Sequence, residues 1–368
     1  MRLHVQNTVF ISLMVFFSAF GFSREFESSK LDKITVVDGV PWSIEPIDEH
    51  RFLIALRQGD LIILDGQTGA VTPVSGVPEV YASGQGGLMD VIVSPTDNDV
   101  IYFTYAKPID KGGAPTLAKA RLNGSELVGW QDLFSSNVVV TSGRHFGSRL
   151  AFDDEGDLYM TIGDAGERDN AQQTQNHAGS IIRLDPDGSV PKDNPFVDNS
   201  DVAPEIYSYG HRNPQGIVYD KKRKQLWAIE HGPRGGDELN LIHAGANYGW
   251  PITSHGKEYW GPISAGEAQE KEGIEPPKKV YIPSIAPGSL FLYQGEKFPR
   301  LNGILLIGAL KLTHLNILDV NEAGQVLEER RYYEDLGERI RDITADSEGN
   351  VWLTADSGTI YKISRAYE

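Results

Sequence analysis

Short apolar runs along the chain alternate with turns rich in aspartate, glycine and asparagine. Six segments repeat the order apolar run, polar turn, apolar run, at intervals of roughly 50 to 70 residues. They begin at Trp42, Met89, Arg149, Gly216, Ser289 and Ile340. Apolar runs bounded by such turns are typical of β-hairpins. The pattern therefore predicts six hairpins and few helices.

Further apolar runs follow several of these hairpins. Clear examples lie at 61–64, 181–184, 315–318 and 359–363. Additional strands beside each hairpin would complete a four-stranded sheet, which is the unit of a β-propeller blade. The sequence thus predicts an all-β fold, a six-bladed β-propeller with four-stranded antiparallel blades. A two-sheet β-sandwich is the alternative.

The amino-terminal segment, 1–23, differs from the rest of the chain. Arg2 precedes a nearly uninterrupted apolar run over 8–22, and small residues close this run. Such an order is typical of a secretory signal peptide, and the run is shorter than the about 20 residues that a membrane span needs. We therefore expect a signal peptide at 1–23, one propeller domain over 24–368, and a periplasmic or otherwise exported protein without a transmembrane segment.

The composition narrows the range of partners. The chain carries 51 acidic and 34 basic residues, which gives a formal net charge of −17. Nucleic acids and anionic membranes bind to cationic faces, so this charge opposes both partners and favours a small molecule. The chain has no cysteine, so no disulfide would support an exported fold. The oligomeric state stays open between a monomer and a homodimer.

In a propeller, the first strand of each blade runs along the central channel and the second strand returns beside it. The start of the first strand and the end of the second therefore lie on one face. Polar residues occupy these two positions in several of the repeats. Gln85, His145, Arg212, Asn213 and Arg339 precede first strands, and Asp164, Gly232 and Lys311 follow second strands. We expect polar groups from five blades to converge at one mouth.

His145 and Asp164 fall at the two outer ends of one predicted hairpin. A carboxylate that accepts a hydrogen bond from one imidazole nitrogen leaves the other nitrogen free, which makes a general base with a fixed tautomer. The ordinary histidine pKa of about 6.5 suits removal of a hydroxyl proton near neutral pH. A satisfied core histidine is the alternative interpretation, and Arg144 and Arg149 are alternative partners for Asp164.

Four cations are predicted around this mouth in an otherwise acidic protein. They are Arg212, Lys311, Arg339 and Arg341. Arginine binds carboxylates through two parallel hydrogen bonds and lysine supplies a point charge, so the cluster favours a ligand with carboxylates or quinone oxygens. Arg339 and Arg341 alternate along one strand, which places both on the same face.

The segment 230–240 contains candidate ligands for a metal ion. A turn there exposes the carbonyls of Gly232 and Pro233, and Asp237 and Glu238 follow it. Oxygen donors of this kind suit Ca²⁺. The sequence contains no HExxH, CxxC or GxSxG motif and no GxGxxG after a strand, which argues against a zinc peptidase, a serine hydrolase and a nicotinamide enzyme.

Eight motifs are spread along the mature chain between residues 84 and 342. They are GQGGLMD (84–90), RHFGSRLAFD (144–153), GSVPKDNPF (188–196), YGHRNPQG (209–216), EHGPRGGDELN (230–240), NYGWP (247–251), GALK (308–311) and RIRD (339–342). Together they resemble the soluble quinoprotein glucose/sorbosone dehydrogenase family, in particular its bacterial aldose sugar dehydrogenases, which use pyrroloquinoline quinone (PQQ). The family is a six-bladed propeller, which agrees with the repeat pattern.

The resemblance implies a role for each residue at the mouth. His145 would take the proton of the C1 hydroxyl of an aldose while hydride passes to PQQ. Asp164 would orient His145, and Arg212 would stabilise negative charge on the quinone oxygen. The cofactor-binding residues that the resemblance implies are Gln85, Arg212, Asn213, Tyr259, Lys311, Arg339 and Arg341.

The resemblance also implies calcium. One Ca²⁺ would bridge the cofactor and the main-chain carbonyls of Gly232 and Pro233, and a further Ca²⁺ would bind Glu238 and the carbonyl of Tyr248. An electron acceptor, either a quinone or a small redox protein, would reoxidise the enzyme. The segments 167–179 and 252–279 do not match the loops of a strict glucose enzyme, so the sugar stays open.

Two alternatives come from other functional classes. One is a non-catalytic sugar- or protein-binding propeller, which would be expected to lack His145 or the arginines. The other is a calcium-dependent lactonase-type hydrolase, which needs side-chain carboxylates on its axial metal, whereas the predicted mouth is mostly cationic.

Overall fold

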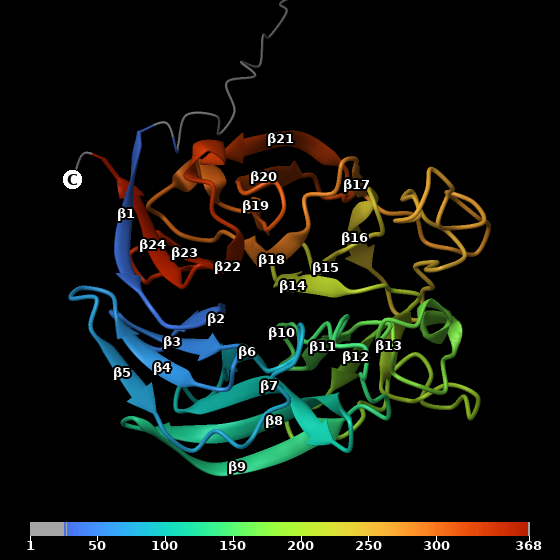
Figure 1. Cartoon of the computed structure of the whole chain (residues 1–368), viewed down its shortest axis with the longest axis horizontal. Coiled ribbons are helices and arrows are strands. Elements are labelled where there is room, and N and C mark those ends of the chain that lie inside the picture. The colour runs from blue at the N-terminus through green and yellow to red at the C-terminus, as the bar shows by residue number, and fades with distance from the viewer. Residues whose placement is uncertain (1–25, 27, 367–368) are drawn as a thin grey trace, which may run out of the picture.

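The computed structural model of the protein describes residue 26 and residues 28–366. Within these residues the chain forms six four-stranded sheets around a central axis, which is the architecture of a β-propeller (Figure 1). The predicted fold class is confirmed, and the β-sandwich alternative is wrong. The predicted signal peptide, 1–23, lies outside the described residues and stays a prediction.

Five blades are built from strands that follow one another along the chain. Their strands are β2 (Pro41–Pro46), β3 (Arg51–Leu56), β4 (Leu61–Asp65) and β5 (Val71–Val74); β6 (Leu88–Val93), β7 (Val100–Ile109), β8 (Gly112–Asn123) and β9 (Glu126–Ser135); β10 (Leu150–Phe152), β11 (Leu158–Ile162), β12 (Ser180–Leu184) and β13 (Ile206–Tyr209); β14 (Pro214–Asp220), β15 (Gln225–Glu230), β16 (Asp237–Ile242) and β17 (Lys279–Tyr281); and β18 (Pro287–Leu292), β19 (Leu305–Ala309), β20 (Leu315–Val320) and β21 (Val326–Tyr332).

The sixth blade closes the ring with strands from both ends of the chain. Its strands are β22 (Ile340–Ala345), β23 (Val351–Ala355), β24 (Thr359–Arg365) and β1 (Ser29–Val36). β1 pairs antiparallel with β24 along its length. The two ends of the propeller are therefore held together by main-chain hydrogen bonds.

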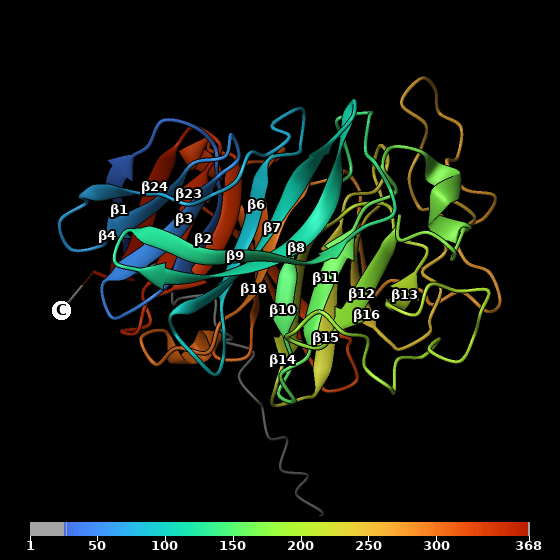
Figure 2. The same cartoon turned by 90° about the horizontal axis from the view of Figure 1, so that it is seen from below.

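Helical structure in the described residues is short. It consists of the 3₁₀ helices η2 (Arg168–Gln172), η3 (Pro299–Leu301) and η4 (Glu334–Leu336). In both views, η2 lies beside the segment 252–278 at the edge of the molecule (Figure 1, Figure 2). None of the helices in the described part of the chain has the length and apolar character needed to cross a membrane.

The first two strands of each blade are the hairpins that the sequence predicts. In five of the six, an aspartate in the turn accepts backbone N–H hydrogen bonds from residues two to four positions later. These aspartates are Asp48, Asp97, Asp153, Asp220 and Asp346. An aspartate side chain stabilises a turn in this way without help from distant residues. The exception is the connection between β18 and β19, which is longer and contains η3.

Apolar side chains pack between neighbouring blades. Successive residues of a strand point to opposite faces of its sheet, so a central strand contributes to two interfaces. On β3, Leu53 packs in the cluster shared with the β6–β9 blade, and Ile54 packs with Trp352 of the sixth blade. Both faces of the strand are therefore apolar, which explains its continuous hydrophobic sequence.

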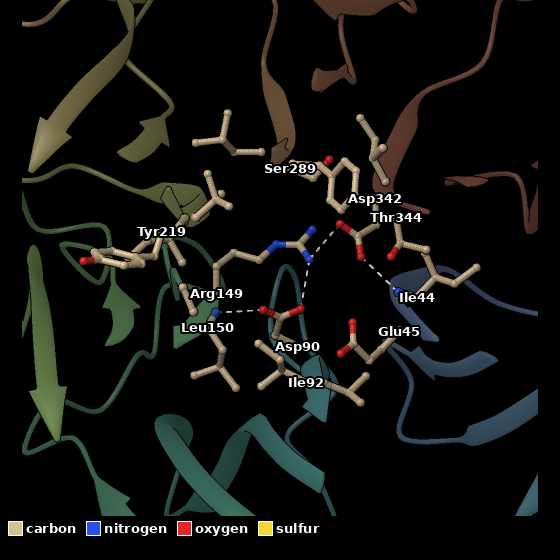
Figure 3. A pocket seen from close by; sticks show the side chains of 18 of the residues that line it. Ile44, Glu45, Asp90, Ile92, Arg149, Leu150, Tyr219, Ser289, Asp342 and Thr344 are labelled. Carbon is tan, nitrogen blue, oxygen red and sulfur yellow. Dashed lines mark hydrogen bonds and ion pairs between the residues drawn. The ribbon is translucent and has the colours of Figure 1, made fainter. Parts of the chain in front are cut away.

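The axis of the propeller is occupied by the buried side chain of Arg149, which immediately precedes β10 (Figure 3). Its guanidinium nitrogen lies 3.1 Å from a carboxylate oxygen of Asp90 and 3.2 Å from one of Asp342. The guanidinium also donates to the main-chain oxygens of Gln215, Gly288 and Arg341. Asp342 in turn accepts the N–H of Ile44 at 2.9 Å. These residues belong to all six blades, so one cation connects the whole ring.

Replacing Arg149 by methionine should lower the free energy of unfolding by about 3 to 5 kcal/mol, because Asp90 and Asp342 would be left buried without a cation. Burial already raises the pKa of Asp342 to about 6, and Arg149 opposes this rise. Arg121→Met is a matched control, since Arg121 pairs with two surface aspartates and such pairs contribute about 0 to 1 kcal/mol. Urea denaturation measures both variants, and equal losses would contradict the role of Arg149.

Candidate active site

Polar groups from four blades meet in a pocket of about 340 Å³. Among the predicted site residues, its lining contains Gln85 before β6, His145 before β10, Arg212 before β14, Gly232 and Pro233 after β15, Tyr259 and Lys311. The other lining residues are His231, Arg234, Asp237, Ser284 and Ala286. The strand ends thus converge as the repeat pattern predicts, although from four blades rather than five.

A tight turn holds His145 at the wall of this pocket. His145 has a φ of 64°, in the left-handed region that residues other than glycine rarely adopt. Its backbone N–H donates to Oε1 of Gln85 at 2.7 Å. Gly163 passes so close that a Cβ there would lie 2.2 Å from the carbonyl oxygen of His145. The surrounding backbone therefore fixes the position of the imidazole.

His145 and Asp164 form a buried pair. Nδ1 of His145 lies 2.6 Å from Oδ1 of Asp164, and the two side chains are 10% and 2% exposed. Because an ionised carboxylate only accepts hydrogen bonds, Nδ1 carries the proton and Nε2 is left as the acceptor. Oδ1 of Asp164 also accepts the N–H of Gly166, and Oδ2 accepts Nε1–H of Trp250 at 2.8 Å. The pair has the geometry of a general base with a fixed tautomer.

The charge states of this pair follow from its surroundings. Burial lowers the pKa of His145 below 6.5, and the charges of Arg212 and Arg144 act in the same direction, whereas Asp164 opposes them. Burial alone would raise the pKa of Asp164, but the hydrogen bond from His145 and its further partners hold that pKa below 3.8. At neutral pH the imidazole is therefore neutral and the carboxylate ionised.

The alternative partners of Asp164 are engaged elsewhere. Arg149 binds Asp90 and Asp342 on the axis, and Arg144 donates to the carbonyl oxygen of Gly166 at 3.3 Å. Asp164 is thus paired with His145 and not with an arginine.

Arg212 lines the same pocket as His145. Its Nη1 donates to the carbonyls of His231 and Gly232 at 3.1 and 2.9 Å, and its guanidinium carbon lies 5.3 Å from the ring centroid of Trp250. Nε of Arg212 is buried and has no hydrogen-bond partner among the described residues. A buried donor without a partner is costly, so it indicates a place where a ligand would supply the acceptor.

Asn213 and the two arginines of the sixth blade lie outside the lining of this pocket. Asn213 is buried behind it, where its Oδ1 accepts the N–H of Gly147 and its Nδ2 has no partner among the described residues. Nε of Arg339 and Nε of Arg341 each lie 2.8 Å from a carboxylate oxygen of Asp356. Both arginines thus reach the same carboxylate, and Asp356 offsets their charge.

Lys311 differs from these arginines. It lines the pocket and takes part in no ion pair with another described residue. The positive charge that faces the pocket therefore comes from Lys311, Arg212 and Arg234.

The predicted calcium ligands are mainly carbonyl oxygens. The carbonyl of Gly232 accepts from Arg212, and that of Pro233 accepts from Oγ of Ser284 at 3.2 Å. Nearby, Asp237 accepts the N–H of Gly232 through Oδ1. No cluster of three or more His, Cys, Asp or Glu side chains in the described part of the chain is arranged to hold a metal ion. A calcium ion at this position would be coordinated mainly by main-chain carbonyl oxygens.

Glu238 and Tyr248, the second predicted metal pair, line a small neighbouring cavity. Burial raises the pKa of Glu238 well above 4.5, and the carboxylate of Glu230, which lies directly opposite on β15, raises it further. The hydroxyl of Tyr248 is already bonded to the carbonyl of Leu241, which leaves its main-chain oxygen as the predicted ligand.

Three residues at the site were not identified from the sequence. Asp356 directly follows β23, the second strand of the sixth repeat. Asp164 was identified because it follows the second strand of its own repeat, and the same rule would identify Asp356. His231 also follows a second strand and lines the pocket. Trp250 contacts both Asp164 and Arg212, and its only sequence signal was its place in the NYGWP motif.

The structure is a six-bladed propeller with a polar pocket formed by residues of four blades, and comparison with known proteins specifies the family. Residues 39–362 match the Glucose / Sorbosone dehydrogenase family. The aldose sugar dehydrogenase YliI of Escherichia coli (strain K12) is 37% identical over 333 residues, which cover 88% of this chain and 90% of that protein. The chain therefore belongs to the glucose/sorbosone dehydrogenase family, as the motifs predicted.

Two further comparisons agree with this family assignment. The crystal structure of the soluble aldose sugar dehydrogenase from Escherichia coli in the apo-form superposes with a TM-score of 0.87 at 35% identity, covering 92% of this chain and 99% of that chain. Quinoprotein glucose dehydrogenase B of Acinetobacter calcoaceticus is 27% identical over 405 residues, covering 86% of this chain and 83% of that protein. Both similarities extend over nearly the whole propeller.

Proposed function

We propose that the protein is a PQQ-dependent aldose sugar dehydrogenase that oxidises the C1 hydroxyl of an aldose to the lactone. The observation that carries this proposal is the buried His145–Asp164 pair at the wall of a cationic pocket. His145 is neutral and its Nε2 is a free acceptor, so it can take the hydroxyl proton. When bound, PQQ supplies the acceptor for the hydride that leaves C1.

Two other side chains support this proton transfer. Asp164 is ionised and stabilises the imidazolium that forms when His145 accepts the proton. Arg212 presents a buried Nε–H that has no partner within the described chain, and this group would donate to an oxygen that gains negative charge. Such preorganised donors act most strongly where water is excluded.

The residues that line the pocket, together with Asn213 behind it, fit an anionic, planar cofactor. Nε of Arg212 and Nδ2 of Asn213 lack partners among the described residues, and Lys311 supplies a positive charge for a carboxylate. Tyr259 lies at the rim, where it is 66% exposed and free to cover a ring. The residues that would hold PQQ are Gln85, Arg212, Asn213, Tyr259, Lys311, Arg339 and Arg341.

Calcium is part of the proposal. The carbonyls of Gly232 and Pro233 would hold one Ca²⁺ next to the cofactor. A second Ca²⁺ at Glu238 and the carbonyl of Tyr248 would offset the repulsion between the buried carboxylates of Glu238 and Glu230. Oxygen ligands of both kinds are usual for this ion.

We also propose that residues 1–23 direct export and are removed, leaving 24–368 as the mature propeller, because their sequence has the order of a signal peptide. Amino-terminal sequencing of the exported protein checks this cleavage site. An aldose is the proposed substrate, and a quinone or small redox protein the proposed electron acceptor. A purely binding propeller would have no use for a fixed, neutral His145, and a lactonase would need carboxylates where this pocket is cationic.

His145→Gln should retain PQQ but lose about 100- to 10,000-fold in kcat, because glutamine keeps the polarity and cannot take the proton. Wild-type kcat should fall as the pH drops through the lowered pKa of His145, since the protonated ring has no free lone pair. Steady-state kinetics of the PQQ-loaded proteins with aldoses and an artificial acceptor measure both effects. Near wild-type activity in His145→Gln would contradict the proposed base.

Arg339→Ala and Arg341→Ala should each weaken calcium-dependent PQQ binding by about 1.5 to 3 kcal/mol, the usual contribution of a charged hydrogen bond. Lys311→Ala should weaken it similarly, because Lys311 faces the pocket without a competing carboxylate. Titration of the apo-protein with PQQ in the presence of Ca²⁺ measures the affinities, with the surface variant Arg121→Ala as the control. Unchanged affinity in the two sixth-blade variants would remove them from the cofactor site.

A further inference from the structure

Trp250 lies between the two charged residues on which the proposed chemistry depends. It is 7% exposed. Its Nε1–H donates to Oδ2 of Asp164 at 2.8 Å, and its ring centroid lies 5.3 Å from the guanidinium carbon of Arg212. One rigid side chain thus contacts both the partner of His145 and the cation beside it.

The backbone of Trp250 is fixed by the segments that carry these two residues. Its N–H donates to the carbonyl of Gly210 at 2.8 Å, two residues before Arg212. Its own carbonyl accepts from Nε2 of Gln172 at 2.7 Å, on η2, which follows Asp164 in the chain. The indole is therefore held in place independently of its contact with the carboxylate.

A second arginine also lies against the indole. The guanidinium carbon of Arg168 is 5.5 Å from the ring centroid of Trp250, within the range of a cation–π contact. Arg168 forms two hydrogen bonds with Glu258, at 2.8 and 3.2 Å, and Glu258 is adjacent to Tyr259 at the rim of the pocket. The indole thus connects the interior of the site to the segment 252–278.

We propose that Trp250 is a positioning residue, whose indole N–H holds the carboxylate of Asp164 in the orientation that directs His145 toward the substrate. This inference rests on the proposed function. Each oxygen of Asp164 then has a defined task, since Oδ1 serves His145 and Oδ2 serves Trp250. Oδ1 also accepts the N–H of Gly166, so loss of the indole N–H would leave Oδ1 bonded to His145 while Oδ2 is no longer held and the plane of the carboxylate is no longer fixed.

The indole N–H has an electrostatic effect as well as a geometric one. A hydrogen bond donated to a carboxylate stabilises its negative charge. Without that bond, the charge of Asp164 would act more strongly on the imidazolium, and the pKa of His145 would rise. Other groups that act on His145 are Arg212, Arg144 and His231. Arg212 packs on the ring of Trp250, and phenylalanine keeps an aromatic ring at that position, so the shift reports on Asp164.

The test uses Trp250→Phe, which keeps an aromatic ring and removes the N–H. In the cofactor-free protein labelled with ¹⁵N-histidine, NMR titration should show the pKa of His145 raised by roughly 0.5 to 1 unit. The His145 signal is identified by its absence in His145→Gln. If Trp250→Phe does not fold, benzothienylalanine at position 250 provides the same test, because it has the shape of tryptophan without the N–H.

Two controls separate positioning from packing. Trp227→Phe changes a fully buried tryptophan whose Nε1 has no hydrogen-bond partner among the described residues, so it should leave the titration of His145 unchanged. In an Asp164→Asn background, Trp250→Phe should no longer raise the pKa, because the charge on which it acts is gone. An unchanged pKa in Trp250→Phe, or an equal rise in Trp227→Phe, would overturn the inference.

The loaded enzyme gives a second readout. Trp250→Phe should lower kcat by roughly 10-fold through misplacement of the base, leave KM within about twofold, and move the acidic limb of the pH profile upward with the pKa of His145. A wild-type protein that oxidises no aldose would refute the proposed function, while the NMR titration would still decide the role of Trp250. If Trp250→Phe had the kcat and pH profile of the wild-type enzyme, the positioning role of Trp250 would be contradicted.

Discussion

The ion pairs of Arg149 on the axis are the interaction on which the rest of the structure depends. The inner strands of six blades approach one another there, and they bring carboxylates and main-chain oxygens away from water. A single guanidinium supplies donors for Asp90, Asp342 and three carbonyls. Because these acceptors belong to different blades, the cation sets how the inner strands are placed around the ring, and the candidate site is built from the ends of those strands.

The site then follows from position and burial. His145, four residues before Arg149, is held by Gln85 and by the close approach of Gly163. Burial keeps its imidazole neutral, while Asp164 stays ionised through its hydrogen-bond partners. A neutral base beside an ionised carboxylate, facing a cationic pocket, is suited to removing a proton from a sugar hydroxyl.

Local signals explain what could be predicted from the sequence. Turn aspartates and apolar runs identified the six hairpins, and strand-end positions identified His145, Arg212 and Lys311 as neighbours. The partners of Arg149 and the pairing of β1 with β24 could not be predicted, because they join residues far apart in the chain without a local pattern. Asp356 was missed although it occupies a strand-end position directly after β23, and it partly neutralises the predicted cationic cluster.

In the proposed reaction, hydrogen leaves C1 of an aldose within this pocket. Anaerobic mixing of the protein, loaded with PQQ and Ca²⁺, with an aldose tests this directly when the absorbance of PQQ is followed in a stopped-flow instrument. We predict one reduction per site, formation of the lactone, and slower reduction when C1 carries deuterium. Absence of reduction, or an equal rate for the deuterated sugar under conditions where reduction limits the rate, would contradict the claim.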